Sequence, residues 1–408
     1  MGTFLARQPI LDKSLRVVGY ELLHRSFEGS SGYQAADSNA ATAQVIADCL
    51  SSEDLRALVM GTAAFINFPE QTLLDGFATM LEPELVVVEV LETVTPSPNV
   101  VAALNRIKHA GYRIALDDYA AAPRYKPLVE LADIVKIDVR ATSVVAPRRY
   151  VKNARPRVKF LAEKVETYEE FHAARRLGYE YFQGYFFSRP SVIATKRAAA
   201  YGAHLIQLME AVQPKELDYR TIERIISRDA ALTHLLLRYV NSAMFGLRNP
   251  VSSVTQALML IGEADVRRWA SLTALCGLGA GKPRELLVLS LIRARFCEQI
   301  GHALALPLTS SMFLAGLLSL LDAMTDRPME EALEGLPLDG KIKAAILGQR
   351  NEPECVMTDV LEIVKVYEAA NWDRVTELTA VARIDTAQLA GIYRDALKWA
   401  EHAFASAS

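Results

Sequence analysis

The stretch FLARQPILDKSLRVVGYELLHR, residues 4–25, decides the fold of the first half of the chain. It contains two strand-like runs, residues 4–10 and 17–25, that are rich in Val, Leu, Phe and Tyr. Only the short segment LDKSLR joins them. A helical crossover between parallel strands needs about a dozen residues or more. We therefore expect these two strands to pair antiparallel.

Further strand candidates follow this pair and alternate with amphipathic stretches. They cover residues 64–68, 86–93, 112–119, 134–139, 159–165 and 181–187. One intervening stretch, SPNVVAALNRIKHAG at residues 97–111, has a helical pattern and closes on Gly111, which is typical of a helix C-cap. Repeated β-then-α units with largely apolar strands indicate a buried parallel sheet. About eight strands suggest a closed barrel, with an open sheet as the alternative.

The second half of the chain follows a different pattern. From about residue 194, apolar residues recur at helical spacing and strand signals almost vanish. We predict an all-α domain of roughly nine to eleven helices. The chain has 408 residues, more than one domain usually holds, so two domains are expected. We place them at residues 1–193 and 213–408, with residues 194–212 as a connecting helix.

Composition and charge exclude several classes of protein. The formal net charge is −3, from 45 Lys and Arg against 48 Asp and Glu, so nothing supports nucleic-acid binding. No apolar run approaches the ~18–20 residues that a membrane span needs. The N-terminus MGTFLARQPILDKS lacks the pattern of a signal peptide. We therefore expect a cytoplasmic protein without a membrane span.

Polar side chains stand within or just after most of the predicted strands. They are Glu21, Asn67, Glu89, Glu92, Asp117, Asp118, Lys136, Glu163, Glu166 and Gln183. For a single acid, a helix N-cap or a surface ion pair is the simpler explanation. A buried carboxylate without a partner is very costly, however, so its repetition over successive strands needs a common cause.

A metal site at the end of a barrel is that common cause. The carboxyl ends of barrel strands converge on one face, where α/β barrels place their chemistry. Oxygen ligands from Asp, Glu and Asn suit Mg²⁺ or Mn²⁺. Two such ions can activate a water and stabilise the leaving oxygen of a phosphodiester. Lys136 would then orient the water or neutralise developing charge.

The order and neighbours of these residues resemble the EAL domain, a family whose active members hydrolyse cyclic di-GMP to the linear dinucleotide pGpG. The resemblance covers residues 3 to about 192, and its ordered motifs are RQPILDKSLRVVGYELLHR, FINF, VEVLET, LDDY, VKID, LAEKVET and FQGYFFSRP. It implies a modified TIM-like (β/α) barrel whose first strand runs antiparallel. This agrees with the short segment LDKSLR.

The resemblance also implies roles for individual residues. The residues that would ligate two Mg²⁺ or Mn²⁺ ions are Glu21, Asn67, Glu92, Asp117 and Asp118, with Asp117 at both sites. The catalytic set would be Glu163, as the base or water-orienting group, with Lys136, Glu166 and Gln183. The residues at the positions where the family contacts cyclic di-GMP are Gln8, Arg25 and Pro190. The guanidinium of Arg25 suits a phosphate.

The chain departs from the family pattern at the loop after Asp118. Active members carry Gly-Thr-Gly and small polar residues there, whereas this chain reads AAAPRYKP at residues 120–127. Proline fixes φ and the missing glycines remove positive-φ options, so the loop cannot take the same path. The motif LAEKVET also has Lys164 where the family has glycine. Changes around a metal site can weaken affinity or activity by ~10–100-fold. Hydrolysis and a catalytically silent cyclic di-GMP receptor or scaffold therefore both stay open.

The second half resembles the HDOD domain, a relative of HD-type phosphohydrolases, over residues 205 to about 400. The resemblance rests on ISRDAALTHLLLRYVNSAMFG, residues 226–246, with Asn241-Ser242-Ala243 as its sharpest signature. Catalytic HD proteins need a His-Asp pair. At the corresponding place, in AGLLSLLDAM, this chain has Ser319 and Leu320. We therefore expect a non-catalytic module that regulates the barrel or binds a protein partner, with a homodimer also open.

Overall fold

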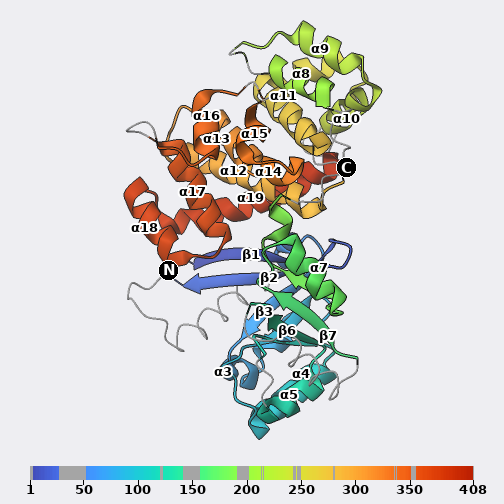
Figure 1. The fold of residues 1–408 in the computed structure, drawn as a ribbon, viewed down its shortest axis with the longest axis vertical. Helices are drawn as coiled ribbons and strands as arrows, with labels where there is room; N and C mark the ends of the chain where they lie inside the picture. Colours follow the sequence, from blue (N-terminus) through green and yellow to red (C-terminus); the bar gives the residue numbers. More distant parts are fainter. Residues whose placement is uncertain are drawn as a thin grey trace. The chain divides into compact units, whose positions relative to one another are not determined.

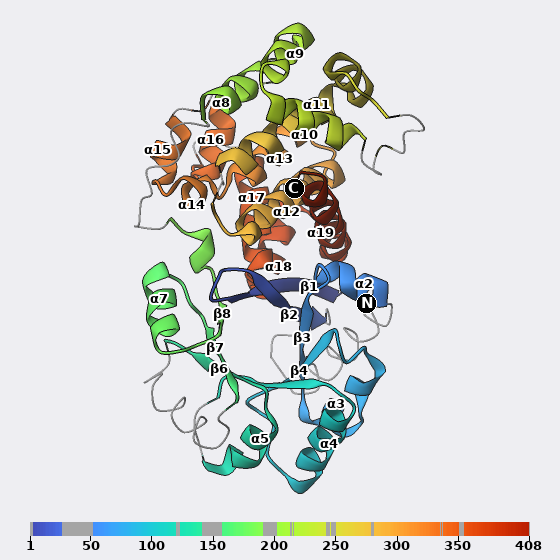
Figure 2. The same ribbon diagram turned by 90° about the vertical axis from the view of Figure 1, so that its right-hand side faces the viewer.

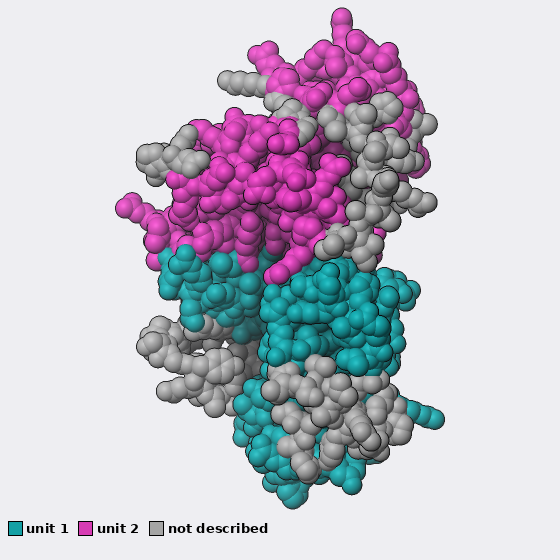
Figure 3. Space-filling model, in the orientation of Figure 1, with its two compact units in different colours: residues 1–187, 366–377, 385–391 teal, residues 188–365, 378–384, 392–408 magenta. Residues whose placement is uncertain are grey.

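The structure is a computed structural model that divides into two compact units (Figure 3). Unit 1 holds residues 1–187, 366–377 and 385–391, and unit 2 holds residues 188–365, 378–384 and 392–408. The expected domain boundaries at residues 193 and 213 stay a prediction. The residues that the structure describes are 3–26, 52–119, 123–140, 157–190, 202–212, 214, 216–241, 245, 250–278, 281–334, 336, 338–350 and 355–407.

Unit 1 is built on a closed barrel with strand order β1 to β8 (Figure 1). The strands are Thr3–Asp12 (β1), Val17–Ser26 (β2), Ala63–Phe68 (β3), Val86–Val90 (β4), Arg113–Leu116 (β5), Ile134–Asp138 (β6), Lys159–Glu163 (β7) and Tyr181–Gln183 (β8). Strand β1 is antiparallel to both of its neighbours, β2 and β8. All other neighbouring strands are parallel. The predicted barrel with an antiparallel first strand is therefore confirmed, and the sheet is not open.

The reversal between β1 and β2 is fixed by a tight turn around Asp12. Its carboxylate accepts hydrogen bonds from the backbone N–H of Ser14 (2.7 Å) and of Arg16 (3.0 Å). The Asp12 N–H in turn donates to the Arg16 carbonyl at 2.8 Å. Leu15 takes the left-handed conformation with φ 59° that closes the turn. Side-chain capping of this kind lets a short polar segment replace a crossover helix.

Helices on the outside of the barrel connect the parallel strands (Figure 2). The α-helices of this part are Ser52–Leu58 (α2), Glu70–Leu74 (α3), Pro98–His109 (α4), Lys126–Leu131 (α5) and Tyr168–Arg176 (α7). The 3₁₀ helices are Phe77–Met80 (η1), Pro123–Tyr125 (η2) and Phe186–Ser188 (η3). Helix α4 begins where the Ser97 hydroxyl accepts from the Val100 N–H (3.3 Å), with Pro98 in its first turn. Gly111, at φ 94°, follows its end, so the helix expected within residues 97–111 is confirmed.

The strands end earlier than the sequence pattern suggests, and this places the polar residues. Strands β4 and β5 stop at Val90 and Leu116. Glu92, Asp117 and Asp118 therefore lie in the loops immediately after the strands. Deeper in the barrel, a layer of apolar side chains fills the interior; it consists of Ile10, Ala63, Phe65, Val87, Ala115, Ile134 and Leu161. The barrel is thus packed below a polar mouth.

Two segments from late in the chain, residues 366–377 and 385–391, belong to unit 1. Strand β1 pairs with β8 only through residues 10–12, so its first residues have a free edge. There the Tyr367 hydroxyl donates to the Leu5 carbonyl (3.0 Å) and accepts from the Leu5 N–H (3.4 Å). The Tyr185 hydroxyl donates to the Glu368 carbonyl at 3.0 Å. The late segments therefore cap a strand edge that would otherwise be open.

Unit 2 is helical, as predicted. The helices from residue 202 onward are Gly202–Ala211 (α8), Tyr219–Ser227 (α9), Ala230–Val240 (α10), Val254–Leu278 (α11), Arg284–Ala303 (α12), Thr309–Leu318 (α13), Leu321–Thr325 (α14), Met329–Glu334 (α15), Gly340–Ile346 (α16), Val356–Glu368 (α17), Trp372–Ala382 (α18) and Thr386–Ala407 (α19). The described residues thus hold more helices than we expected, because the periodic runs at residues 218–243 and 309–324 each contain two. None of the described helices is long and apolar enough to span a membrane.

Helices α12 and α13 pack closely because a glycine stands between them. A Cβ atom on Gly316 would lie 2.4 Å from the Arg293 carbonyl oxygen of α12. The break between α13 and α14 falls at Ser319 and Leu320.

Candidate functional site

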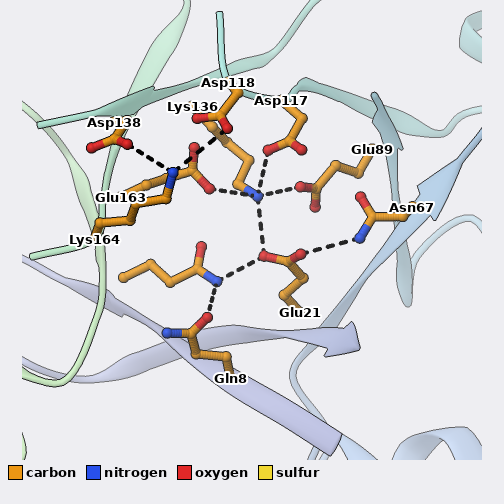
Figure 4. Close-up of polar contacts among 11 residues, drawn as sticks. Gln8, Glu21, Asn67, Glu89, Asp117, Asp118, Lys136, Asp138, Glu163 and Lys164 are labelled. Atoms are coloured by element: carbon orange, nitrogen blue, oxygen red, sulfur yellow. Dashed lines mark hydrogen bonds and ion pairs between the residues drawn. The ribbon is translucent and has the colours of Figure 1, made fainter. Parts of the chain in front are cut away.

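A cluster of charged side chains at the barrel mouth surrounds the Lys136 ammonium (Figure 4). Lys136 comes from β6, and only 1% of its side chain is exposed. Its Nζ lies 2.8 Å from Glu163 Oε1, 2.9 Å from Asp117 Oδ1 and 3.0 Å from Glu21 Oε2, and it also contacts Glu89 Oε1. The four carboxylates come from β2, β4, β7 and the end of β5. The barrel therefore gathers them from four separate strands.

The cluster carries excess negative charge, because one ammonium faces four carboxylates. Burial lowers the pKa of Lys136, but the carboxylates, Glu21 foremost, outweigh burial and raise this pKa well above its usual value. Burial and the neighbouring Glu21 raise the pKa of Glu89 well above its usual range, against the effect of Lys136. Burial raises the pKa of Glu163 to about 8; Lys136 opposes the rise, and Asp117 and Glu21 add to it. Glu89 and Glu163 therefore hold a proton more readily than ordinary carboxyl groups.

Amide side chains hold the carboxylate of Glu21 in place. The Asn67 amide donates to Glu21 Oε1 at 3.1 Å. The Gln183 amide donates to Glu21 Oε2 at 2.7 Å and to Gln8 Oε1 at 2.8 Å. Gln8 stands directly opposite Glu21 in the β1–β2 register. Strands β1, β2, β3 and β8 therefore contribute to one hydrogen-bonded network.

The donor set fits a divalent cation. Glu89 Oε2 and Glu163 Oε2 are buried without a hydrogen-bond partner among the described residues. Buried carboxylate oxygens in that condition are costly, and a cation would satisfy them. As the side chains stand, no three His, Cys, Asp or Glu residues of the described chain surround a common metal position. The Lys136 ammonium occupies the point on which the carboxylates converge, so its Nζ would have to shift for an ion to bind there.

A second lysine lies at the outer edge of the site. Lys164 Nζ lies 2.7 Å from Asp138 Oδ2 and 3.7 Å from Asp118 Oδ2 (Figure 4). The hydrogen bond to Asp138 raises the pKa of Lys164 above its usual value. Asp118, at φ 38°, and Lys164, at φ 56°, both adopt the left-handed backbone conformation that is uncommon outside glycine. The acid expected to hold a second ion is thus paired with an ammonium of the chain itself.

The structure brings Glu89 into the cluster and leaves Glu92 outside it. Our sequence assignment of a ligand had named Glu92. Glu89 is fully buried and lies beside Asn67 in the β3–β4 register. Glu92 follows the end of β4 and lines a cavity of about 270 Å³ together with Asp117 and Asp118. The signal that points to Glu89 is its place inside an otherwise apolar buried strand, where a carboxylate needs partners.

The remaining predicted site residues have other surroundings. Glu166 forms an ion pair with Arg140 at 2.6 Å. Pro190 is exposed after η3. Arg25 lies in β2 opposite Phe4, and its side chain lies outside the described residues.

The altered loop after Asp118 builds one wall of the 270 Å³ cavity. Residues 120–122 lie outside the described residues, and η2 and α5 follow them. The Tyr125 hydroxyl donates to the Glu92 carbonyl at 3.4 Å, and the Tyr119 and Tyr125 rings meet edge to face at 6.4 Å. The Arg124 guanidinium lies 4.9 Å from the centre of the Tyr125 ring. The loop is therefore anchored to the end of β4 by aromatic and backbone contacts.

In unit 2, a cationic side chain contacts Ser319, the residue that the family resemblance sets at the place of the His-Asp pair. The Ser319 hydroxyl accepts from Arg293 Nη1 (3.1 Å) and donates to the Gly316 carbonyl (2.8 Å). Ser319 and Arg293 are both buried. The signature residue Asn241 is structural, because its amide exchanges hydrogen bonds with the Val251 N–H (2.7 Å) and carbonyl (2.8 Å). It thereby fastens the end of α10 to the segment before α11.

Comparison with known proteins agrees with this architecture. The EAL domain family matches residues 3–190, and the HDOD domain family matches residues 202–324. The chain belongs to the proteins in which an EAL domain is followed by an HDOD domain.

Two relatives match nearly the whole chain. Cyclic di-GMP phosphodiesterase CdgJ of Vibrio cholerae is 33% identical over 403 residues, which cover 98% of this chain and 92% of that protein. The uncharacterized protein YuxH of Bacillus subtilis is 32% identical over 408 residues, 98% of each chain. Among solved structures, an EAL domain protein from Listeria monocytogenes EGD-e is 25% identical, covers 47% of this chain and 89% of that one, and has a TM-score of 0.36.

Proposed function

We propose that the barrel hydrolyses cyclic di-GMP to pGpG with the help of Mg²⁺ or Mn²⁺, and that the helical half regulates it or binds a protein partner. The observation that carries this proposal is the convergence of four carboxylates from separate strands on one buried point that holds a single ammonium. The relative CdgJ, whose name states a cyclic di-GMP phosphodiesterase, supports the choice of substrate.

The chain's own side chains would hold the divalent ions at the barrel mouth. The residues we assign to the inner ion are Glu21, Asn67, Glu89 and Asp117. Asp117 and Asp118 are the expected ligands of an outer ion. Bound there, a divalent ion makes a water more acidic and offsets the charge of the phosphate. Gln183 and Asn67 keep the Glu21 carboxylate oriented through their hydrogen bonds.

We assign Glu163 as the group that accepts the proton. Its Oε2 is buried without a hydrogen-bond partner among the described residues. In the reaction, a water oxygen attacks phosphorus, the bond from phosphorus to the 3′ oxygen breaks, and the water's proton passes to Glu163 Oε2. The freed 3′ oxygen takes a proton from solvent, and Lys136 offsets the negative charge on the phosphate.

The contacts with the nucleotide bases and phosphates remain proposals. Gln8 is the candidate whose side chain reaches the cluster, through its hydrogen bond with Gln183. Arg25 and Pro190 keep the roles that the EAL family implies. Glu166, held by Arg140, would position the loop after β7 instead of touching the reacting atoms.

Turnover of cyclic di-GMP by the purified chain tests the proposal. With Mn²⁺ or Mg²⁺, we expect pGpG as the product, detected by chromatography. Glu89→Gln should abolish it, whereas Glu84→Gln, at an exposed acid just before the same strand, should not. Activity that survives in Glu89→Gln but disappears in Glu92→Gln would contradict the assignment of the inner site. No product from the wild type above the Glu89→Gln background would refute hydrolysis.

A silent receptor is the second candidate function, and the loop AAAPRYKP favours it. This loop lacks the glycines of active family members and contains Pro123, which starts η2. Calorimetry with cyclic di-GMP separates the outcomes. Binding without turnover would establish a receptor, and no binding would leave a protein-interaction scaffold.

The proposed role of the helical half is tested by hydrogen exchange. If this half regulates the barrel or reports its state, cyclic di-GMP should change amide exchange in α12 and α13 as well as in the strands. Glu89→Gln, which is expected to lose the metal site, serves as the control. Exchange changes confined to the strands would speak against such coupling.

A further inference from the structure

The second lysine of the barrel mouth, Lys164, stands where the family sequence has glycine, and it faces the acid of the expected outer metal position. We propose that the Lys164 ammonium is a built-in cation that takes the charge role of the outer divalent ion, so that the barrel binds one divalent ion tightly and a second only weakly. This inference rests on the proposed metal-dependent function.

The contacts of Lys164 place its charge at the outer position. Its Nζ lies between Asp138 Oδ2, at 2.7 Å, and Asp118 Oδ2, at 3.7 Å (Figure 4). Asp118 is the ligand that distinguishes the outer ion from the inner one, because Asp117 is expected at both. Lys164 itself also approaches the inner carboxylate Glu163 closely enough to interact electrostatically with it. An ion bound to Asp118 would therefore sit beside an ammonium.

The two positions differ in charge balance. At the inner position, four carboxylates face the single ammonium of Lys136, so a divalent ion reduces an excess of negative charge. At the outer position, the Lys164 ammonium already offsets part of the negative charge of Asp118 and Asp138. Repulsion between an ammonium and a divalent ion about 4 Å apart costs about 2 kcal/mol even at the dielectric constant of water, which is a factor of about 30 in affinity.

The backbone keeps Lys164 at this position. At φ 56° its conformation is one that glycine adopts freely and other residues adopt at a cost. Its N-terminal neighbour Glu163 is fixed by β7 and by Lys136, and its C-terminal neighbour Val165 donates a backbone hydrogen bond to the Gln183 carbonyl at 3.0 Å. Although 56% of the Lys164 side chain is exposed, its start is therefore rigid.

An ordinary surface ion pair is the competing explanation. Exposed pairs contribute little to stability, and an ion pair of that kind would not alter metal binding. The two explanations differ in the number of ions bound, which does not depend on turnover.

Titration of the metal-free chain with Mn²⁺ tests the inference. The free ion is followed by its electron paramagnetic resonance signal. We expect the wild type to bind one Mn²⁺ per chain tightly and a second only weakly. In Lys164→Gln, the dissociation constant of the second Mn²⁺ should be lower than in the wild type by about tenfold or more. Lys164→Arg keeps the charge and should behave as the wild type. Lys159→Gln removes an exposed lysine from strand β7, which precedes Lys164, and should also leave the second site weak.

The outcomes separate this inference from the proposed function. A second Mn²⁺ that binds equally well to the wild type and to Lys164→Gln overturns the inference, and the proposed function stands if the first ion still binds and pGpG still forms. A tenfold gain in Lys159→Gln as well would overturn it too, because the effect would then follow net charge alone. Absence of any bound Mn²⁺ in the wild type overturns the proposed function. Unchanged affinity for the first ion verifies folding, and Lys164→Gly is the second variant should Lys164→Gln misfold.

Discussion

Lys136→Met should destabilise the metal-free barrel by about 3–5 kcal/mol. The substitution keeps an unbranched side chain of similar length but removes the one ammonium that four carboxylates share. Only 1% of the Lys136 side chain is exposed, so water cannot replace the lost charge. Removal of one partner from a buried ion pair leaves its uncompensated charges behind, which is the origin of the large figure.

Protonation sets how much of this cost appears at a given pH. Burial and neighbouring carboxylates already raise the pKa values of Glu89 and Glu163. Without Lys136, which opposes both shifts, these groups should take up protons more readily. The loss in Lys136→Met should therefore be smaller at pH 6 than at pH 9. Excess Mn²⁺ should restore much of the stability, because a divalent ion then supplies the missing positive charge.

Urea unfolding combined with amide exchange of peptides from β4 and β6 measures the effect locally in the barrel. Lys159→Met is the matched control, because Lys159 is exposed on the neighbouring strand β7; its effect should stay within about 0.5 kcal/mol. A Lys136→Met barrel that loses less than about 1 kcal/mol without metal, or that Mn²⁺ fails to stabilise, would refute the electrostatic reasoning. A variant that folds only with Mn²⁺ would be the extreme form of the expected result.

Three further predictions concern other parts of unit 1. Gly184→Ala should lower the free energy of unfolding in urea by about 3 kcal/mol or more, because at φ +143° the new Cβ would lie 2.0 Å from the Val165 carbonyl oxygen. Gly61→Ala, at φ +71° in open space, should lower it by about 1 kcal/mol. The metal-free barrel should lose stability as pH rises from about 5 to 8. The pKa of Glu163 is about 8 in the folded chain against an ordinary 4.5, so the folded chain binds this proton more tightly than the unfolded chain does. Urea midpoints that rise over this pH range would contradict the prediction. Tyr367→Phe should cost about 1–2 kcal/mol, because it removes both hydrogen bonds to Leu5, and amide exchange at the start of β1 should report the loss.

Local signals made most of the fold predictable. The segment LDKSLR is too short for a crossover helix, and that alone fixes the antiparallel first pair. Alternation of buried strands with amphipathic helices indicated the parallel remainder. Helix boundaries were less accessible, because residues 309–324 have one continuous apolar periodicity although the chain breaks at Ser319 and Leu320. Long-range contacts left no local signal: nothing in the sequence around Tyr367 shows that its hydroxyl completes the edge of β1.

The candidate site was predictable in composition but not in geometry. Acids at successive strand ends could be recognised from their repetition, and the structure gathers Glu21, Asp117 and Glu163 around Lys136. The choice between Glu89 and Glu92 depends on where β4 ends, and the strand stops at Val90, three residues before the end expected from the sequence. A sequence motif that contains both acids cannot supply that boundary.

The two lysines of the barrel mouth, Lys136 and Lys164, bear on whether the chain hydrolyses cyclic di-GMP or only binds it. Lys136 is buried among four carboxylates, so an ion that enters there lowers the net charge and the lysine can remain nearby. Lys164 already lies beside Asp118 and Asp138, so an ion that enters there is repelled by its ammonium. A divalent ion should therefore bind first at the inner position, and a second ion should bind more weakly at the outer position. If hydrolysis requires both ions, Lys164 and the loop AAAPRYKP both limit the rate, and Lys164→Gln should raise turnover at low Mn²⁺. If one ion suffices, Lys164→Gln should bind a second Mn²⁺ without any gain in turnover.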